Sequence, residues 1–393
     1  MAPLWLLPVK IQAMIKEKWK NSLRSPLFWF ATVVAPLACC LFFTSLMKSG
    51  LPAEMPIGLV DEDATATSRE IGRNLDAFQH VRLAGRYATV AEARKAMQQG
   101  DIYGFYLIPR QTARRAQRGE VPTVSFYTSY SYLVAGSLIY KDMRTMAELS
   151  SGAAARSVLY ARGATERQAM AYLQPIVIDV NPIGNPWLNY SVYLSNTLVP
   201  GVLCLFVLLL TGYTLGADFK AGRARTALER CGGSVFRLLF AQLLPQTVAF
   251  LLTGGLIVLI LYGVLRYPCF CGIPTMLLVV SLLVLAAQGL GIAIFSLLPT
   301  QRMAMSGGAL LGVVSFSICG MSFPVMAMHP ALQGLALLSP LRHYFLLYVN
   351  CALDGYSLLN AWPYVVALLL MALLPLPVAP LLRKAFLRYG YEP

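Results

Sequence analysis

The feature that most constrains this chain of 393 residues is the uneven placement of its apolar runs. One run, Leu27–Met47, lies near the N-terminus, and the others lie in the second half, beyond a long polar stretch. Each run has about 20 residues or more, enough for a helix to cross a hydrocarbon core of roughly 30 Å. We therefore expect six transmembrane helices, over residues 27–47, 191–216, 238–265, 275–298, 303–328 and 361–382.

Composition and charge placement agree with a multi-pass membrane protein. The chain is 57% hydrophobic and only 13% charged, which is more apolar than a soluble domain of this length. Fourteen basic residues fall on the segments expected inside, against two on the short outer loops, Arg266 and Arg342. Because basic residues collect on the cytoplasmic side, both termini are predicted to be cytoplasmic, with residues 48–190 outside and 383–393 as an inner tail. The net charge of +14 therefore fixes topology, and we expect no nucleic-acid partner.

Residues 48–190 alternate between strand and helix patterns. Strands are expected at 56–60, 81–84, 102–108, 121–128 and 176–180, and helices at 67–78, 89–99, 111–118, 131–162 and 165–173. Thr89, with Glu92 three residues later, has the spacing of a capping box at the start of one helix. The predicted fold class is an α-helical integral membrane protein with six transmembrane helices and an inserted extracytoplasmic α/β domain.

The predicted outer domain offers little for catalysis. The acids between Asp61 and Asp63 follow a strand, where a solvated turn is a more frequent role than a metal or general-base cluster. His80 is the only histidine in this region and has no spaced acid or cysteine partner. The aromatic residues between Phe126 and Tyr132 suit packing on the domain core better than stacking on a ligand. We expect no catalytic residue, no metal and no cofactor on this chain, so it is not predicted to be an enzyme.

The eight cysteines do not form a disulfide scaffold, because none lies between residues 48 and 190. Cys269, Cys271 and Cys351 fall in predicted outer loops, where pairing is open to them, and the sequence leaves their state undecided. The others are expected to act as buried hydrophobic residues within or beside the spans.

Residues 1–26 predict a cytoplasmic helix in the plane of the membrane interface. Apolar residues recur at helical spacing between Ile11 and Leu23, while Lys16 and Arg24 belong to a basic face. This pattern is typical of an amphipathic interfacial helix, with Trp19 at headgroup depth. Pro26 is expected to end this helix just before the first span.

Residues 217–237 form a basic segment between the second and third predicted spans. The pattern predicts a short amphipathic helix, broken at Gly232, that docks on a soluble partner and passes its motion to two spans. The residues assigned to this surface are Lys220, Arg223, Arg225, Thr226, Leu228, Glu229, Arg230 and Gly232. The alternative is that the arginines only hold the loop inside, and composition does not separate the two interpretations.

The spans themselves carry few polar residues. Four amides, Asn196, Gln242, Gln246 and Gln288, either line a pathway or form hydrogen bonds between helices, which is the more frequent role. No ionisable residue lies in the central turns of the spans, which argues against a proton-coupled carrier or an intramembrane hydrolase. The chain also lacks a Gly-x-x-x-x-Gly-Lys-Ser/Thr loop, so it has no phosphate-binding loop for ATP.

Together these features resemble the permease subunit of an ABC exporter, in the ABC-2 family with a large external loop between the first and second transmembrane helices. Thr226, Leu228 and Glu229, with Ala227 between the first two, resemble the family's Gly-Thr-Leu-Glu-like coupling segment. The stretch ending at Gly355 resembles its external helical hairpin, expected over residues 329–360. The resemblance implies a separate ATPase subunit that binds ATP and Mg, and a dimer with a second permease copy or a paralogue.

The resemblance further implies outward, ATP-driven movement of an amphipathic or lipid-like small molecule. The long helix expected over 131–162 would project well beyond the membrane headgroups, toward a partner across a periplasm, which predicts a bacterial inner membrane. The size of the outer domain favours a docking module, with a periplasmic adaptor and an outer-membrane channel as possible partners. The alternative is a membrane receptor or scaffold whose outer domain docks an envelope protein without moving cargo. The sequence leaves the cargo and the choice between homodimer and heterodimer open.

Overall fold

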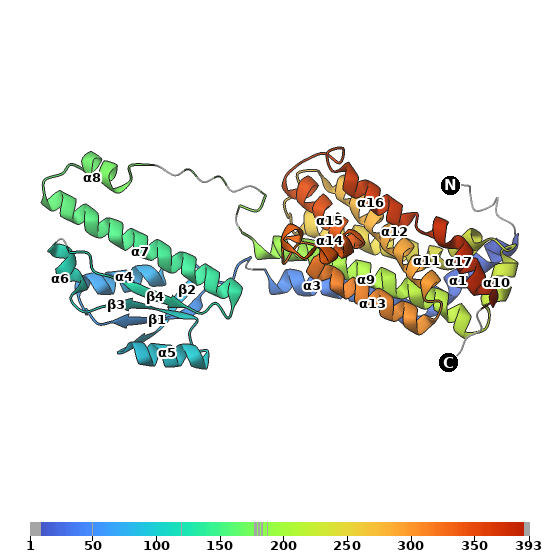
Figure 1. Ribbon diagram of the computed structural model, residues 1–393, viewed down its shortest axis with the longest axis horizontal. Coiled ribbons are helices and arrows are strands. Elements are labelled where there is room, and N and C mark those ends of the chain that lie inside the picture. Colours follow the sequence, from blue (N-terminus) through green and yellow to red (C-terminus); the bar gives the residue numbers. More distant parts are fainter. Residues whose placement is uncertain are drawn as a thin grey trace. The chain divides into compact units, whose positions relative to one another are not determined.

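The computed structural model describes residues 9–48, 50–118, 120–176, 179, 181, 184–186 and 188–388. The chain divides into two compact units, which are described separately (Figure 1). The helical unit comprises Met1–Lys48 with Pro182–Pro393, and the α/β unit comprises Ser49–Asn181.

The α/β unit is built on a four-stranded sheet in the order β2-β1-β3-β4. The central strand β1 (Met55–Asp61) pairs in parallel with β2 (Val81–Tyr87) and β3 (Gly104–Ile108), and β4 (Ser125–Thr128) adds an antiparallel edge. The helices of this unit are α4 (Ala66–Asp76), α5 (Val90–Gln99), α6 (Thr112–Gln117), α7 (Leu133–Ala161) and α8 (Glu166–Leu173). Helices α4 and α7 cover one face of the sheet and α5 covers the other (Figure 1).

Some strand bounds and one helix cap of this unit differ from the sequence expectations: β2 runs to Tyr87 and not to 84, and β3 begins at Gly104 and not at 102. The fourth strand begins at Ser125 and not at 121, because Pro122 has no N–H to give to a strand ladder. The Thr89 hydroxyl does accept the Glu92 N–H, but the Glu92 carboxylate accepts from Ala88 and not from Thr89, so the capping box is incomplete. The strand expected at 176–180 lies largely outside the described residues.

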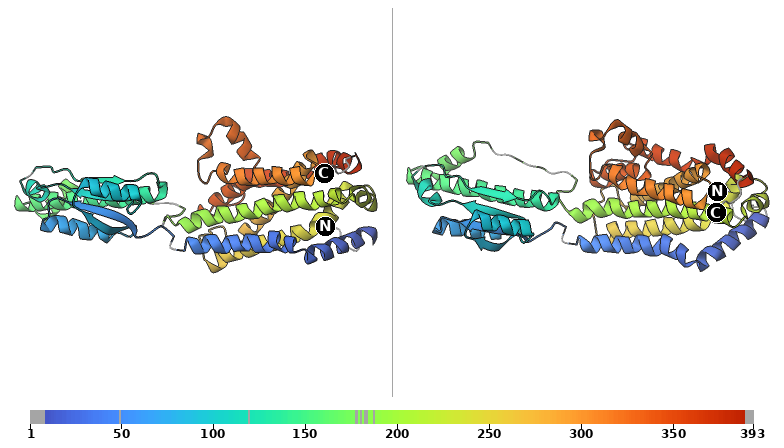
Figure 2. Two further views of the ribbon diagram at one scale, coloured as in Figure 1. Left: turned by 90° about the horizontal axis from the view of Figure 1, so that it is seen from below. Right: turned by 60° about the horizontal axis from the view of Figure 1, so that its bottom comes forward.

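The helical unit contains α1 (Val9–Arg24), α2 (Pro26–Trp29), α3 (Ala35–Leu46), α9 (Tyr190–Lys220), α10 (Ala224–Arg230), α11 (Val235–Val258), α12 (Ile273–Leu297), α13 (Gln301–Ile318), α14 (Pro330–Leu337), α15 (Pro340–Leu347), α16 (Trp362–Ala372) and α17 (Pro375–Arg388). Short π-helical turns, η2 (Phe30–Val34), η3 (Leu259–Val264) and η5 (Tyr348–Leu353), continue α2 into α3, extend α11 and extend α15. Helix α9 runs between α3 and α13 and contacts both (Figure 2).

Five helical segments among the described residues are long and apolar enough to cross a membrane. They are Pro26–Leu46, Tyr190–Lys220, Val235–Val264, Ile273–Leu297 and Trp362–Leu387. The sixth predicted span, 303–328, is not among them, because α13 ends at Ile318 after 18 residues and begins with polar Gln301 and Arg302. Beyond it the chain turns at Gly320, whose φ of 98° suits glycine, into the short 3-10 helix η4 (Val325–Ala327). A sixth crossing by α13 therefore stays a prediction.

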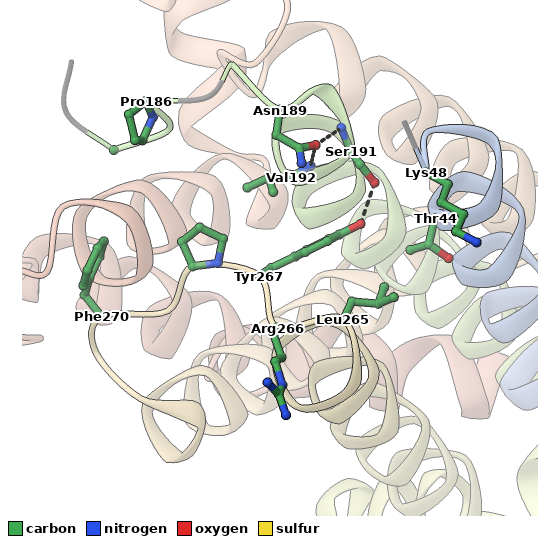
Figure 3. Close-up of a pocket in the computed structure, with 12 residues that line it drawn as sticks. Thr44, Lys48, Pro186, Asn189, Ser191, Val192, Leu265, Arg266, Tyr267 and Phe270 are labelled. Atoms are coloured by element: carbon green, nitrogen blue, oxygen red, sulfur yellow. Dashed lines mark hydrogen bonds between the residues drawn. The ribbon is translucent and has the colours of Figure 1, made fainter. Parts of the chain in front are cut away.

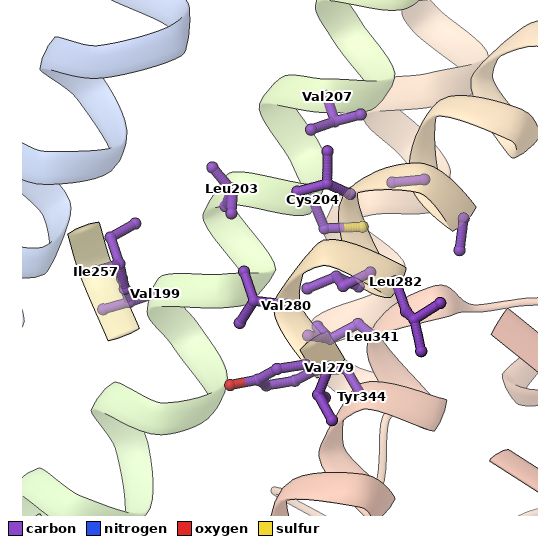
Figure 4. Close-up of a cluster of buried hydrophobic side chains, with 14 of the residues drawn as sticks. Val199, Leu203, Cys204, Val207, Ile257, Val279, Val280, Leu282, Leu341 and Tyr344 are labelled. Atoms are coloured by element: carbon purple, nitrogen blue, oxygen red, sulfur yellow. The ribbon is translucent and has the colours of Figure 1, made fainter. Parts of the chain in front are cut away.

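The core of the helical unit packs side chains of α9 against α11, α12 and α15. Val199, Leu203 and Val207 recur every four residues along α9 and face this cluster (Figure 4). Lipid is as apolar as these side chains, so close packing and not water exclusion must hold such helices together. The seam between α9 and α13 shows this, since a Cβ added at Gly216 or Gly312 would lie 2.5 Å from Gln301 or Leu205.

Candidate functional site

The short helix α10 is isolated from its neighbours by glycines on both sides. Gly222 precedes it, Gly232 and Gly233 follow it, and all three have φ between 66° and 72°, a region that glycine enters without steric cost. The Gly233 N–H donates to the Leu228 carbonyl at 3.0 Å and closes the helix. The chain therefore enters and leaves α10 by sharp turns, which set it as a separate element between α9 and α11.

One face of α10 is buried in the helical unit. Ala224, Leu228 and Cys231 are 7%, 2% and 1% exposed and belong to a cluster with residues of α1, α9, α11 and α17. The sequence placed Leu228 on the docking surface as an apolar point. In the structure its side chain points into the helical unit and not outward, so this placement is wrong. The side chain anchors α10 to its own protein, because burial in that cluster satisfies it better than exposure would.

The opposite face of α10 is exposed and charged. Arg225, Thr226, Glu229 and Arg230 all lie on it, and Arg225 pairs with Glu229 at 3.1 Å. Arg230 lies 3.9 Å from Glu17 of α1. Exposed ion pairs of this kind contribute roughly 0.2–1 kcal/mol, so a partner's side chains can replace them at little cost.

A groove of about 630 Å³ lies between α1 and α10. Its lining combines small, apolar and charged side chains of the two helices: Ala13, Met14, Glu17, Thr226, Glu229 and Arg230. Because of this groove, the exposed face of α10 is part of a concave surface and not of a flat one. A complementary protein surface can therefore be recognised by shape as well as by charge.

Asp218, near the end of α9, holds α10 and its neighbouring helices together. This role was not predicted from the sequence. Its side chain is 4% exposed and accepts three hydrogen bonds. Lys18 of α1 donates at 2.7 Å, Gln242 of α11 at 2.6 Å, and Arg223, the residue before α10, at 3.2 Å. One buried carboxylate thus links α1, α9, α11 and the start of α10. The available signal was a single acid close to the end of a long apolar helix.

The remaining residues of the predicted surface surround this cluster. Lys220 is the last residue of α9 and is exposed, and Gly232 lies in the turn that follows α10. In α1, Lys16 and Arg24 are exposed, whereas Trp19 is half-buried against the α10 cluster. Met14 and Ile15 are also buried there, so part of the apolar face of α1 packs on protein.

Two predicted pathway amides form a polar seam between α9 and α11. Gln242 donates to Asp218, and one turn further along Gln246 accepts from Thr214 at 2.8 Å and donates to Thr211 at 3.0 Å. Both glutamines are 2% exposed. Their positions favour interhelical hydrogen bonding over a pathway lining.

The other two amides are also inside the bundle. Gln288 of α12 accepts from Thr247 of α11 at 2.8 Å, and Asn196 donates to the Val192 carbonyl of its own helix at 2.7 Å. All four amide residues are buried within the described bundle, with 7% of the residue exposed at most. We therefore do not retain them as a transport path.

The acids and aromatics of the α/β unit have structural partners. Asp61 accepts from the Ser68 hydroxyl at 2.7 Å, and Asp63 accepts from the Ala113 N–H at 3.1 Å, so both fix the ends of helices. Tyr127 stacks on Phe105 with ring centroids 4.6 Å apart. The packing role predicted for the aromatic stretch is confirmed at this residue.

His80 has a partner that its sequence neighbours did not reveal. Its Nδ1 lies 3.1 Å from Asp142 Oδ2, and its backbone N–H donates to the same carboxylate at 3.3 Å. Asp142 is buried on α7, so the pair fastens that helix to the chain before β2. This arrangement joins two elements and presents no cluster with spare ligands.

Comparison with known proteins identifies one family. The model of the family described as ABC-2 family transporter protein matches residues 26–379, which is nearly the whole chain. The match includes α10, Asp218 and the groove residues of α10, whereas the whole of α1 precedes it. No curated protein matches the sequence.

Proposed function

The chain belongs to the ABC-2 family of transporter proteins, and from this premise we propose that it is the permease subunit of an ATP-driven exporter. A separate ATPase subunit, which binds ATP and Mg, docks on the exposed face of α10 and on the groove beside α1. The observation that carries this proposal is the two-sided character of α10. Leu228 and Ala224 bury one face, and Arg225 and Glu229 leave the other exposed and charged.

The contacts of Asp218 support a route by which ATPase motion reaches the membrane helices. A push on α10 acts on Arg223, which shares the Asp218 carboxylate with Lys18 and Gln242. Because that carboxylate is buried and hydrogen-bonded on several sides, displacement of one partner strains the others. The polar seam between α9 and α11 continues this linkage along two further turns at Thr214 and Thr211.

The proposed setting is a bacterial inner membrane with both termini in the cytoplasm. The basic residues around α10, α1 and α17 support this orientation, since such residues collect on the cytoplasmic side. It requires an even number of crossings, with α13 as the sixth. The tight glycine-mediated seam between α9 and α13 supports that role for an 18-residue helix.

The proposed cargo is an amphipathic or lipid-like small molecule, moved by a dimer of this chain with itself or a paralogue. The α/β unit is proposed to dock a periplasmic adaptor that leads to an outer-membrane channel. The second half of α7 supports a docking role, because its buried residues end at Met146 and Leu149 is 60% exposed. A cleft of about 720 Å³ lies between that half and helices α4 and α6. Its floor includes buried Tyr106, whose pKa is raised to about 12 by burial, so its hydroxyl stays neutral.

Charge reversal on the exposed face of α10 tests the proposal. The Arg225→Glu/Arg230→Glu variant should lower affinity for the ATPase at least about 100-fold, since each of the two lost charged hydrogen bonds contributes roughly 1.5–3 kcal/mol. Both side chains point outward, so insertion and folding should be retained. The matched control is Arg110→Glu, because the Arg110 side chain is 84% exposed but belongs to the α/β unit. This control should leave ATPase binding unchanged.

The binding measurement is co-purification of the tagged chain with the proposed ATPase partner. Native mass spectrometry of the wild-type complex should also show two permease chains, or one with a paralogue. Undiminished ATPase binding by the double variant, with altered topology instead, would show that the arginines only hold the loop inside.

A further inference from the structure

A pocket of about 700 Å³ opens at the end of the helical unit remote from α10. Three segments line it (Figure 3). The first contributes Thr44 and Lys48 at the end of α3 and just beyond it, and the second, before and at the start of α9, contributes Gly184, Pro186, Asn189, Ser191 and Val192. The third, between η3 and α12, contributes Leu265, Arg266, Tyr267, Pro268 and Phe270. The Tyr267 and Ser191 hydroxyls share a hydrogen bond of 2.5 Å, which joins the second and third segments. The pocket is thus built from parts of the chain far apart in sequence.

Two cations, Lys48 and Arg266, line this pocket from different segments, and both are exposed. Within the described residues neither forms an ion pair, and the lining includes no aspartate or glutamate. The carboxylate of Asp354 lies beside Gly184 at the rim. Asp354 forms no ion pair with Lys48 or Arg266 in the described structure. A lining with two cations and no acid favours an anion from outside.

The backbone turn at Arg266 and Tyr267 points their side chains in different directions. Arg266 has a φ of 52°, unusual for a residue other than glycine, and the Tyr267 N–H is held by the Leu261 carbonyl at 3.1 Å. This turn places Tyr267 against Ser191 and leaves the Arg266 side chain exposed (Figure 3). The loop therefore presents the cation while its neighbouring ring closes the base of the pocket.

Apolar side chains complete the lining. Val192, Leu265, Pro268 and Phe270 belong to it, and Phe270 is 72% exposed at the rim. The first N–H groups of α9 are already used, because the Asn189 side chain accepts from Ser191 and Val192. Free cations beside an apolar wall match a ligand with a negative head and a hydrocarbon chain, more closely than a small inorganic anion.

We propose that this pocket binds the anionic headgroup of an amphiphile between Lys48 and Arg266, with its chain along Leu265 and Phe270. The ligand is either a lipid of the surrounding membrane or the exported molecule. Its identification as cargo rests on the proposed function, whereas binding itself requires neither the ATPase nor transport. The pocket lies near the helix ends that the proposed topology places at the outer leaflet.

The test compares phosphatidylglycerol with phosphatidylcholine of identical chains, bound to the full-length protein and counted by native mass spectrometry. A basic residue near a membrane surface contributes about fivefold to the binding of an anionic lipid. The Lys48→Met/Arg266→Met variant should therefore lower the preference for phosphatidylglycerol about 25-fold, and each single variant about fivefold. The charge-conserving variant Lys48→Arg/Arg266→Lys should retain it.

Arg302→Met supplies the matched control, since Arg302 is an exposed cation at the opposite end of the bundle, and it should leave the preference unchanged. An unchanged preference in the double methionine variant would overturn the proposal. Displacement of the lipid by inorganic phosphate as effectively as by dodecyl phosphate would overturn the assignment to an amphiphile. Adding the ATPase with ATP and Mg distinguishes exported cargo from a lipid of the surrounding membrane. ATP turnover should release bound cargo from the pocket, whereas a resident lipid should stay bound.

Discussion

The two ends of α9 differ in how the positive charges beside them are satisfied. At the C-terminal end, Lys18 and Arg223 donate to Asp218 at 2.7 and 3.2 Å. At the N-terminal end, Lys48 and Arg266 line a pocket, and among the described residues neither has an ion-pair partner. The first arrangement fixes helices to one another, whereas the second leaves charge available to a ligand.

This difference shows that a basic residue beside a membrane helix has more than one use. A buried carboxylate with several donors is costly to disturb, so it suits a joint through which force passes. An exposed cation beside an apolar wall costs little to keep and attracts a counter-ion from its surroundings. The position of acids, and not the number of arginines and lysines, separates the two ends.

The largest effect should follow from removing the carboxylate at the joint. Asp218→Asn leaves the Lys18 ammonium and the Arg223 guanidinium without their anionic partner. Because these two side chains are 24% and 65% exposed, the cost should be about 3 kcal/mol, at the lower end of the range for a buried pair. The midpoint of thermal unfolding of the purified protein should fall accordingly. In a reconstituted complex, ATP hydrolysis should become insensitive to cargo.

The control for Asp218 replaces both partners with apolar groups. Lys18→Met/Asp218→Leu removes this charge pair, but Gln242 and Arg223 still lose their acceptor, so it should recover only part of the lost stability. It should not recover the coupling between cargo and hydrolysis. Normal coupling in this double variant would show that the joint is dispensable.

A smaller effect should follow from loosening α10 itself. Leu228→Ala removes a buried side chain from the α10 cluster and should cost about 2–3 kcal/mol, since leucine truncations in cores cost roughly 2–5. The amides of Ala224 to Arg230 should exchange with deuterium faster, as measured by mass spectrometry. The neighbouring exposed Thr226→Ala should change this exchange little, and equal effects of the two substitutions would argue against Leu228 as the anchor.

Breaking the polar seam between α9 and α11 should lower stability less than Asp218→Asn or Leu228→Ala does. Gln246→Leu removes the hydrogen bonds to Thr211 and Thr214, and interhelical hydrogen bonds in membranes contribute about 0.6 kcal/mol on average. A double-mutant cycle with Thr211→Val, read by unfolding in mixed detergent, should give a coupling of this size. A coupling energy as large as the cost of Asp218→Asn would show that the seam, too, is a main connection between α9 and α11.

The smallest effect concerns two thiols outside the spans, one near each end of the bundle. A hydrogen bond from Cys269 lowers the pKa of Cys271, whereas burial raises the pKa of Cys231 beside α10. The thiolate is the reactive form, so at pH 7 Cys271 should react with iodoacetamide faster than Cys231. Cys269→Ala should slow the reaction of Cys271 at pH 7 and leave its rate unchanged above both pKa values. Site-resolved mass spectrometry of the alkylated peptides provides the measurement.

Much of the helical architecture could be predicted from sequence because length and apolarity act locally. Four of the five apolar segments begin and end within a few residues of their predicted bounds, and the break after Ile318 is the main departure. That break depends on Gly320, where Arg342 donates to the Cys319 carbonyl from a distant helix. A hydropathy pattern carries no information about such a contact.

The candidate site was predictable only in part for the same reason. The exposed charges of α10 follow from their spacing, but the burial of Leu228 depends on a surface built by α1, α11 and α17. Lys18 and Asp218 are 200 positions apart in the sequence, so their pairing had no local signal. The count of basic residues that set the topology left Asp218 out, whereas its burial and three hydrogen bonds make it the centre of the cluster.

Photo-crosslinking tests most directly the claim that the α10 end engages an ATPase and the pocket end does not. Benzoylphenylalanine replaces exposed Thr226 on α10 or exposed Phe270 at the pocket rim, and the tagged protein is irradiated in cells that also produce the ATPase. We expect a crosslinked ATPase band from position 226 and none from position 270. A band from position 270, or its absence from position 226 while the ATPase still copurifies, would contradict it.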